Sequence, residues 1–180
     1  MLRVFLRHAA TTGACSAALA GSIQGHRRYA LESLPYALSW DDVRRVIATA
    51  GGDGEGALAL LILLDQFPRN LFRDSAHAFA TDGKALSIAK FAIGEGFDQA
   101  IEPELRPFIY MPLMHSEVLA DQEASVVLFE GLGAKTNLDF ALLHRDIIAR
   151  FGRFPHRNAA LGRATTPEEK AFLEEGGFAG

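Results

Sequence analysis

The chain has 180 residues, of which 49% are hydrophobic and 22% charged, a composition typical of one globular domain with enough chain to bury a core. Its formal net charge of -4 argues against a dedicated nucleic-acid binder, because such domains are strongly basic. The single cysteine, Cys15, excludes a disulfide framework and a cysteine zinc site and fits a reducing compartment.

The longest apolar stretch, residues 57–64, is too short to span a bilayer, so no membrane association is expected. Residues 1–31 carry four arginines and no acid, a pattern that weakly resembles a signal or transit peptide. Polar residues such as His8 and Thr11 interrupt its apolar core. We therefore predict a divergent, poorly ordered arm over residues 1–31, a single helical domain over residues 32–180 and a cytoplasmic protein.

Helical patterns dominate beyond this arm, and the absence of sustained apolar/polar alternation predicts an all-α fold. Helix signals and glycine stops predict a helix over residues 40–50 and a flexible loop over 51–56. Residues 57–66 are apolar nearly all round, as expected of a core helix. Phe67 and Pro68 are expected to end it, because proline disfavours the helical region for the residue before it.

A second group of helices follows this core segment. Asp74 or Ser75 is a candidate cap for a helix that ends near residues 94–96 and that Gly83 divides. Pro112 lies inside an apolar run and predicts a short or kinked helix there.

The C-terminal third contains three more caps. Ser116 is expected to cap a helix over residues 117–132, and Asn137 one over residues 138–151. Thr166 is the strongest cap of the chain, because it precedes a proline and is followed three residues later by a glutamate. Six or seven helices joined by short loops predict an array of helical hairpins.

One basic segment carries most of the binding signal. Residues 140–163 hold five arginines, two histidines and one acid beside an apolar helical stripe, and residues 63–73 repeat its Phe-Pro, Arg and Asn in near form. Arginine offers a planar fork for carboxylates and phosphates, so an anion is expected there. The predicted ligand-binding residues are Asp65, Arg69, Asn70, Arg153, His156, Arg157 and Asn158. The alternative is structural: Asp65 accepts a bidentate pair from Arg69 or Arg157, and the other arginines pair with acids.

The candidates for catalysis are His115, His144, Glu117 and Asp121. Glu117 and Asp121 stand four residues apart, which places them on one helix face beside His115 and suits proton transfer. The alternative is a solvated, acidic helix N-terminus. No metal is expected, because the two-histidine helical spacing is missing, and no cofactor is expected without a glycine-rich phosphate loop. The His-Arg-Asp triplet at His144 lacks every other kinase motif and is typical of a buried histidine.

Several motifs together resemble one family. They are LLDQFPRNLFR (residues 63–73), AFATD (78–82), YMPLMHSEVLADQE (110–123) and HRDIIARFGRFPHRNAALGRATTPEEKAFLEE (144–175). Over about residues 57–173 the chain resembles the bacterial family called domain of unknown function 924. The resemblance implies a tetratricopeptide-like array of antiparallel hairpins and no established activity. The first 50 or so residues diverge, because relatives begin with a Trp- and Phe-rich segment and residues 1–39 contain no tryptophan.

The leading hypothesis is a helical protein that binds a small anionic ligand or an acidic peptide in a groove lined by arginine, histidine and asparagine. The alternative is an enzyme, a hydrolase or transferase acting on a small anionic substrate with His115 or His144 as general base. A third alternative is self-association into a homo-oligomer through an apolar face that the divergent N-terminus leaves uncovered.

Overall fold

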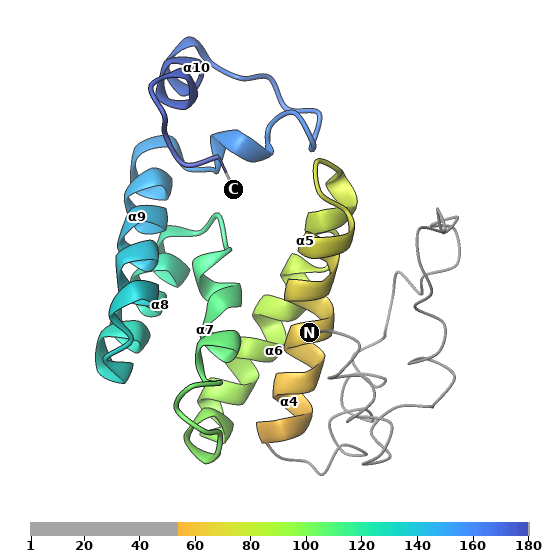
Figure 1. Cartoon of the computed structure of the whole chain (residues 1–180), viewed down its shortest axis with the longest axis vertical. Helices are drawn as coiled ribbons and strands as arrows, with labels where there is room; N and C mark the ends of the chain where they lie inside the picture. The colour runs from red at the N-terminus through yellow and green to blue at the C-terminus, as the bar shows by residue number, and fades with distance from the viewer. Residues whose placement is uncertain (1–53, 180) are drawn as a thin grey trace. The chain divides into compact units, whose positions relative to one another are not determined.

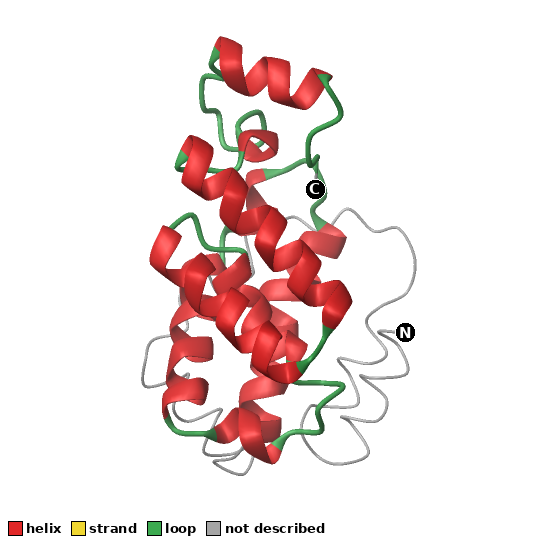
Figure 2. Cartoon of the chain, turned by 90° about the vertical axis from the view of Figure 1, so that its left-hand side faces the viewer, coloured by secondary structure: helices red, strands yellow, loops and turns green. Residues whose placement is uncertain are grey.

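The structure is a computed structural model that describes residues 54–179, which lie in one compact unit of the chain (Figure 1). The arm predicted over residues 1–31 and the helix predicted over residues 40–50 lie outside the described residues. The described elements are α4 (Gly54–Leu61), η2 (Ile62–Gln66), α5 (Phe67–Leu71), η3 (Ala76–Phe79), α6 (Asp82–Gly94), η4 (Phe97–Ala100), α7 (Pro107–Met114), α8 (Leu119–Leu132), α9 (Lys135–Phe151), η5 (Pro155–Arg157) and α10 (Pro167–Glu174). The predicted all-α class is confirmed, since residues 54–179 contain helices and turns but no strand (Figure 2). The tetratricopeptide-like arrangement stays a prediction.

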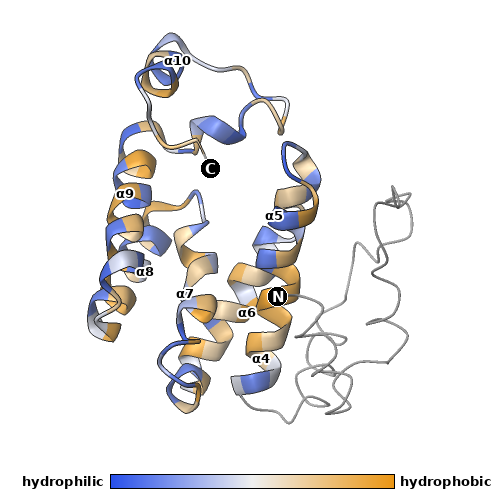
Figure 3. Ribbon diagram, in the orientation of Figure 1, coloured by the Kyte–Doolittle hydropathy of each residue, from blue (hydrophilic) through white to orange (hydrophobic). Residues whose placement is uncertain are grey.

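Consecutive helices pack against one another: α6 contacts α7, α7 contacts α8, and α8 contacts α9. Each contributes apolar side chains to the interior, such as Ile88 of α6, Ile109 of α7 and Phe129 of α8, all fully buried. Figure 3 shows the hydrophobic residues along these helices and on α4, while hydrophilic residues gather on η5 and around α5. The core therefore lies among α4, α6, α7 and α8, and the polar segments end beside it.

The prediction that Phe67 and Pro68 end the core helix is wrong. Residues 62–66 form a π-turn, in which the Phe67 N–H donates to the Ile62 carbonyl, and the helix then continues as α5. Pro68 has no N–H to offer the Leu64 carbonyl four residues earlier. That carbonyl instead accepts a hydrogen bond from Thr81 Oγ1 at 2.5 Å. A tertiary contact thus supplies the partner that proline removed.

Replacing Thr81 with valine should lower the free energy of unfolding by about 1–2 kcal/mol, because the Leu64 carbonyl loses its donor while the side-chain shape is kept. Thr81 makes no capping bond to α6, so the loss does not report on helix capping. Urea unfolding measures the change. Thr136→Val, on the exposed surface of α9, is the matched control; equal losses in the two variants would contradict this role of Thr81.

Other boundaries also differ from prediction, and α4 begins at Gly54, inside the loop predicted over residues 51–56. The break before α6 falls at Ala80 and Thr81 rather than at Gly83, and Ser75 caps the short η3, accepting from the His77 N–H. α8 begins at Leu119: Ser116 lies before the helix, where its Oγ accepts from the Val118 N–H and donates to Asp121 in the first turn of α8.

Helix α9 begins at Lys135, two residues before Asn137, which therefore does not cap it. Gly133, at φ 70°, ends α8 in the left-handed region and turns the chain so sharply that the next helix starts almost at once. The expected capping box of α10 is confirmed: Thr166 Oγ1 accepts from the Glu169 N–H, and Glu169 accepts from the Thr166 N–H.

Gly152 ends α9 with φ 67° and places Phe154 beside the core. Its N–H donates to the Ile148 carbonyl at 2.8 Å, the bond that closes a helix through a left-handed residue. Phe154 is fully buried and packs with Ile147 and Ile148. The 3-10 turn η5 follows, so Arg157 returns toward the helices that precede α7.

Candidate functional site

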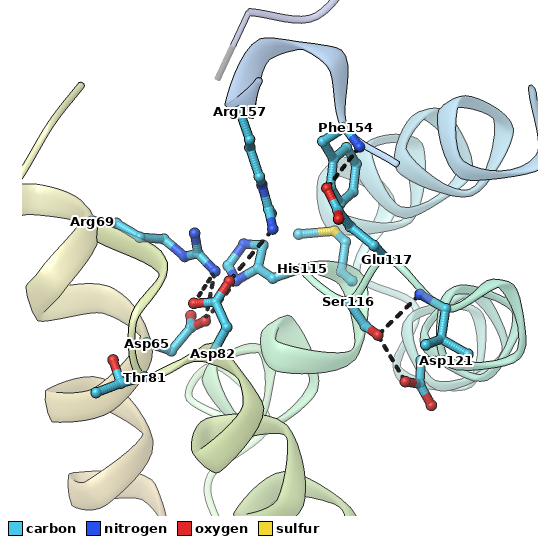
Figure 4. A network of polar contacts seen from close by, with 12 residues as sticks. Asp65, Arg69, Thr81, Asp82, His115, Ser116, Glu117, Asp121, Phe154 and Arg157 are labelled. Carbon is cyan, nitrogen blue, oxygen red and sulfur yellow. Dashed lines mark hydrogen bonds and ion pairs between the residues drawn. The ribbon is translucent and has the colours of Figure 1, made fainter. Parts of the chain in front are cut away.

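Asp65 is the acid at the centre of a polar cluster drawn in Figure 4. It lies in the π-turn, is 1% exposed and accepts hydrogen bonds from Gln66 at 2.5 Å and Arg69 at 3.3 Å. His115 Nδ1 lies 2.7 Å from its Oδ1. Burial disfavours the charge of Asp65, but the charge that His115 gains in acid, the hydrogen bond from His115 and the charge of Arg69 outweigh it, so the pKa of Asp65 lies below its usual value. The predicted bidentate pair with an arginine is wrong, since Arg69 makes one bond.

His115, the residue after α7, is held in one tautomer by this acid. Burial lowers its pKa, and the cations of Arg69 and Arg157 add to the effect against the opposing charge of Asp65. The ring is therefore neutral near pH 7. Because Asp65 can only accept, Nδ1 carries the proton and Nε2 is left as an acceptor. The side chain keeps 13% of its surface exposed.

Asp82, the first residue of α6, joins the two arginines of the cluster. It accepts from Arg69 at 2.8 Å and from Arg157 at 3.4 Å. Burial raises its pKa, although both arginines oppose the rise. Sequence reasoning missed Asp82 as a site residue, although it closes the AFATD motif that carried the family resemblance.

Arg157 is the most buried arginine of the cluster, at 5% exposure. Its guanidinium lies 4.8 Å from the ring centre of Phe79 and 4.3 Å from that of Phe154, and its buried Nε has no partner among the described residues. Burial, with the neighbouring cation of Arg69, lowers its pKa to about 10. Arg157 thus remains charged at pH 7, held by two aromatic rings and one long contact to Asp82.

Two further histidines line the aromatic side of this cluster. His144 lies on α9, with its Nδ1 2.7 Å from the Phe140 carbonyl and its ring 6.5 Å from that of His115. His144 and His156 both pack against Phe154 and Phe178. Burial lowers the pKa of each histidine to about 4. The prediction of a buried, satisfied histidine fits His144, whose Nδ1 donates to the carbonyl.

Glu117 and Asp121 do not share a helix face, so that prediction is wrong. Glu117 precedes α8 and accepts two bonds from Arg163, at 2.7 and 3.0 Å, and one from the Phe154 N–H at 2.9 Å. Burial opposes its charge, yet Arg163 and this N–H hold its pKa below the usual value. Asp121 points elsewhere, to Ser116 and Lys90. Val118, which is extended and precedes α8, separates Glu117 from Asp121 in the helix.

Three predicted ligand contacts also lie apart from the cluster. Arg153 makes two bonds to Glu169, at 2.5 and 2.8 Å, and Asn158 donates to the same carboxylate at 3.2 Å. The Arg153 bond and the N–H of Thr166 help to lower the pKa of Glu169 to about 2. Asn70 is exposed and donates to the Gln66 carbonyl. These residues fasten α10 and the end of α5, which is a structural role.

The candidate site is therefore the cluster of Asp65, Arg69, Asp82, His115 and Arg157. It is called the dyad cluster below, after the Asp65–His115 pair at its centre. A surface hollow of about 390 Å³ lies elsewhere, and no predicted site residue lines it. Its walls are Gln99, Pro103, Arg106, Tyr110, Val127, Leu128, Gly131 and Leu132.

Within residues 54–179, no three His, Cys, Asp or Glu side chains are arranged to hold a metal ion. None of the helices there has the length and apolar character needed to cross a membrane.

Comparison with known proteins identifies the family. The model of the family described as "Bacterial protein of unknown function (DUF924)" matches residues 15–177. The structure is similar to that of ATU0120, a protein of unknown function from Agrobacterium tumefaciens, with a TM-score of 0.69 and 50% sequence identity over 74% of this chain and 75% of that one. No curated protein matches the chain. The match over most of its length shows that the chain belongs to the bacterial DUF924 family.

Proposed function

We propose that this protein binds a small anionic ligand at the dyad cluster, with Arg157 as the main contact. The observation that carries the proposal is the state of Arg157: a cation 5% exposed that, within residues 54–179, has no partner for its buried Nε and a single acceptor at 3.4 Å. A buried charge is costly unless it is paired and hydrogen-bonded. An anion on Arg157 supplies both the charge and the acceptors.

Partial exposure of the surrounding side chains supports access for a small molecule. Arg69, Asp82 and His115 keep 19%, 21% and 13% of their side-chain surface exposed. A small ligand is favoured over an acidic peptide, because the arginines that would form a longer basic strip are already paired with acids. These pairs are Arg150 with Glu168, Arg153 with Glu169 and Arg163 with Glu117.

A thermal-shift screen against small carboxylates, phosphates, nucleotides and phosphoesters tests the proposal. A ligand that binds only the folded protein raises the melting temperature by linkage, by several degrees at about 100 times its Kd. Arg157→Gln should remove the shift, because it deletes the guanidinium cation and leaves a shorter, neutral polar side chain.

Arg145→Gln is the matched control. Arg145 lies on α9, outside the dyad cluster, and pairs with the neighbouring Asp146. This variant should keep the full ligand shift. Circular dichroism of both variants checks that they fold. A ligand shift that survives in folded Arg157→Gln protein would contradict the assignment of the site.

Catalysis is a second candidate function, favoured by one specific contact. The 2.7 Å bond between Asp65 and His115 Nδ1 resembles the acid-histidine arrangement in which a carboxylate orients an imidazole for proton transfer. His115 Nε2 is then the base, and Arg157 and Arg69 supply positive charge for an anionic substrate. The reaction class would be hydrolysis or group transfer.

His115→Asn separates this candidate from binding alone. The asparagine amide can still donate to Asp65, but it lacks the basic nitrogen at the Nε2 position. With a ligand found in the screen, or a phosphoester or ester of it, as substrate, turnover should disappear in this variant while binding to Arg157 persists. An unchanged turnover number would rule out His115 as the base.

A further inference from the structure

Arg157 sets geometric limits on the anion. All N–H groups of a guanidinium lie in one plane, so acceptors bind at its edge and not over its faces. The rings of Phe79 and Phe154, 4.8 and 4.3 Å from the guanidinium carbon, supply apolar surface around it and no donors. A planar carboxylate places both oxygens in the guanidinium plane. A phosphate has further oxygens outside that plane, which would meet these rings.

The charges of the dyad cluster also favour a carboxylate over a phosphate. Two arginines, Arg69 and Arg157, face two acids, but Arg69 contacts both Asp65 and Asp82, and Arg157 reaches only Asp82 among the described residues, at 3.4 Å, so Arg157 has the weaker share of their negative charge. A monoanion beside Arg157 adds one unit of negative charge where that share is weakest. A phosphate dianion adds two, and the cost of uncompensated charge rises with its size in a poorly hydrated place. A monocarboxylate is therefore the better match.

His115 adds the requirement that the ligand carry a hydrogen-bond donor. Its Nδ1 proton is committed to Asp65, which leaves Nε2 as an acceptor. No side chain or backbone group in residues 54–179 donates to Nε2, and the ring is partly exposed. In Figure 4 the end of Arg157 points toward His115, with Asp82 beside both. A ligand carboxylate on Arg157 thus brings its neighbouring atoms close to this acceptor.

We propose, building on anion binding at the dyad cluster, that the ligand class is small hydroxycarboxylates: the carboxylate binds the Arg157 edge, and the adjacent hydroxyl donates to His115 Nε2. Each group of the ligand matches one feature of the site. The planar monoanion suits the guanidinium and the charges around it, and the hydroxyl suits the histidine tautomer.

Three probes of similar size test the proposal at constant ionic strength: glycolate, acetate and inorganic phosphate. Glycolate differs from acetate by the hydroxyl alone. Titrations followed by the imidazole resonances of His115, assigned from their loss in His115→Asn, give the affinities. We expect glycolate to bind about tenfold more tightly than acetate, since a lost polar partner typically costs this much, and phosphate to bind more weakly than acetate.

Two variants test which residue causes the preference for glycolate over acetate and which causes the preference for acetate over phosphate. His115→Asn, followed by thermal shift, should reduce the glycolate preference over acetate to below about twofold, with acetate binding kept, because only the Nε2 acceptor is lost. Arg157→Lys keeps the charge without the planar fork and should narrow the gap between acetate and phosphate.

Tighter binding of phosphate than of either carboxylate, or equal binding of glycolate and acetate, would overturn the hydroxycarboxylate assignment and leave anion binding standing. A glycolate preference that survives in His115→Asn would overturn the role given to His115. If no anion in the thermal-shift screen raises the melting temperature, the proposed function itself is wrong.

Discussion

Replacing Phe154 with alanine is expected to lower the free energy of unfolding by about 3–5 kcal/mol, the largest single-residue effect that we predict. Phe154 is fully buried and packs with Ile147 and Ile148. Its ring also lies 5.3 Å from that of His144 and 4.3 Å from the Arg157 guanidinium. Alanine leaves a cavity at the junction between the C-terminal core and the dyad cluster, and chemical denaturation measures the loss.

Phe140→Ala on α9 is the matched control, because Phe140 is 47% exposed. It should cost less than about 1 kcal/mol. The Phe154 variant should also weaken any ligand binding at Arg157, since the guanidinium loses one of the rings that hold it. Equal destabilisation of the two variants would show that the Phe154 site collapses to fill the cavity.

Acid is expected to destabilise the protein as the pH falls from about 6.5 to about 4, through its buried histidines. The pKa of His144 is about 4 in the folded protein and 6.5 as the ordinary value, so the unfolded chain binds a proton in this range and the folded protein does not. Stability is therefore full above pH 6.5 and declines below it. The expected loss is about 2–3 kcal/mol for this residue at pH 4.5.

His156 adds a loss of the same sign, because burial lowers its pKa to about 4 as well. Urea unfolding at several pH values between 7.5 and 4.5 measures the slope. His144→Gln removes one titrating group, so its stability should fall less steeply with acid than that of the unmodified protein. The carboxylates are common to both proteins, so their contribution cancels in the comparison. Parallel pH profiles would mean that His144 is protonated equally in the folded and unfolded states.

Local patterns predicted the elements that depend on neighbours in the chain. The Thr166 capping box is closed by atoms three residues apart, and the apolar positions of α9 recur at helical spacing. Such contacts follow from backbone geometry alone. The same reasoning failed at Pro68, where the missing donor was replaced by Thr81, thirteen residues farther along the chain.

The candidate site likewise combines residues that the sequence predicted with contacts that only the tertiary structure shows. The sequence alone determined an all-α chain with arginines and histidines beside Phe-Pro corners, and it named Asp65, Arg69, His115 and Arg157. Only the tertiary structure decided their partners: Asp65 with His115 across 50 positions, and Arg157 with Asp82 across 75. The physical reason is that a charged side chain can pair with any opposite charge within reach. Which one is reached depends on how α5, α6, α7 and η5 pack, and no local pattern encodes that packing.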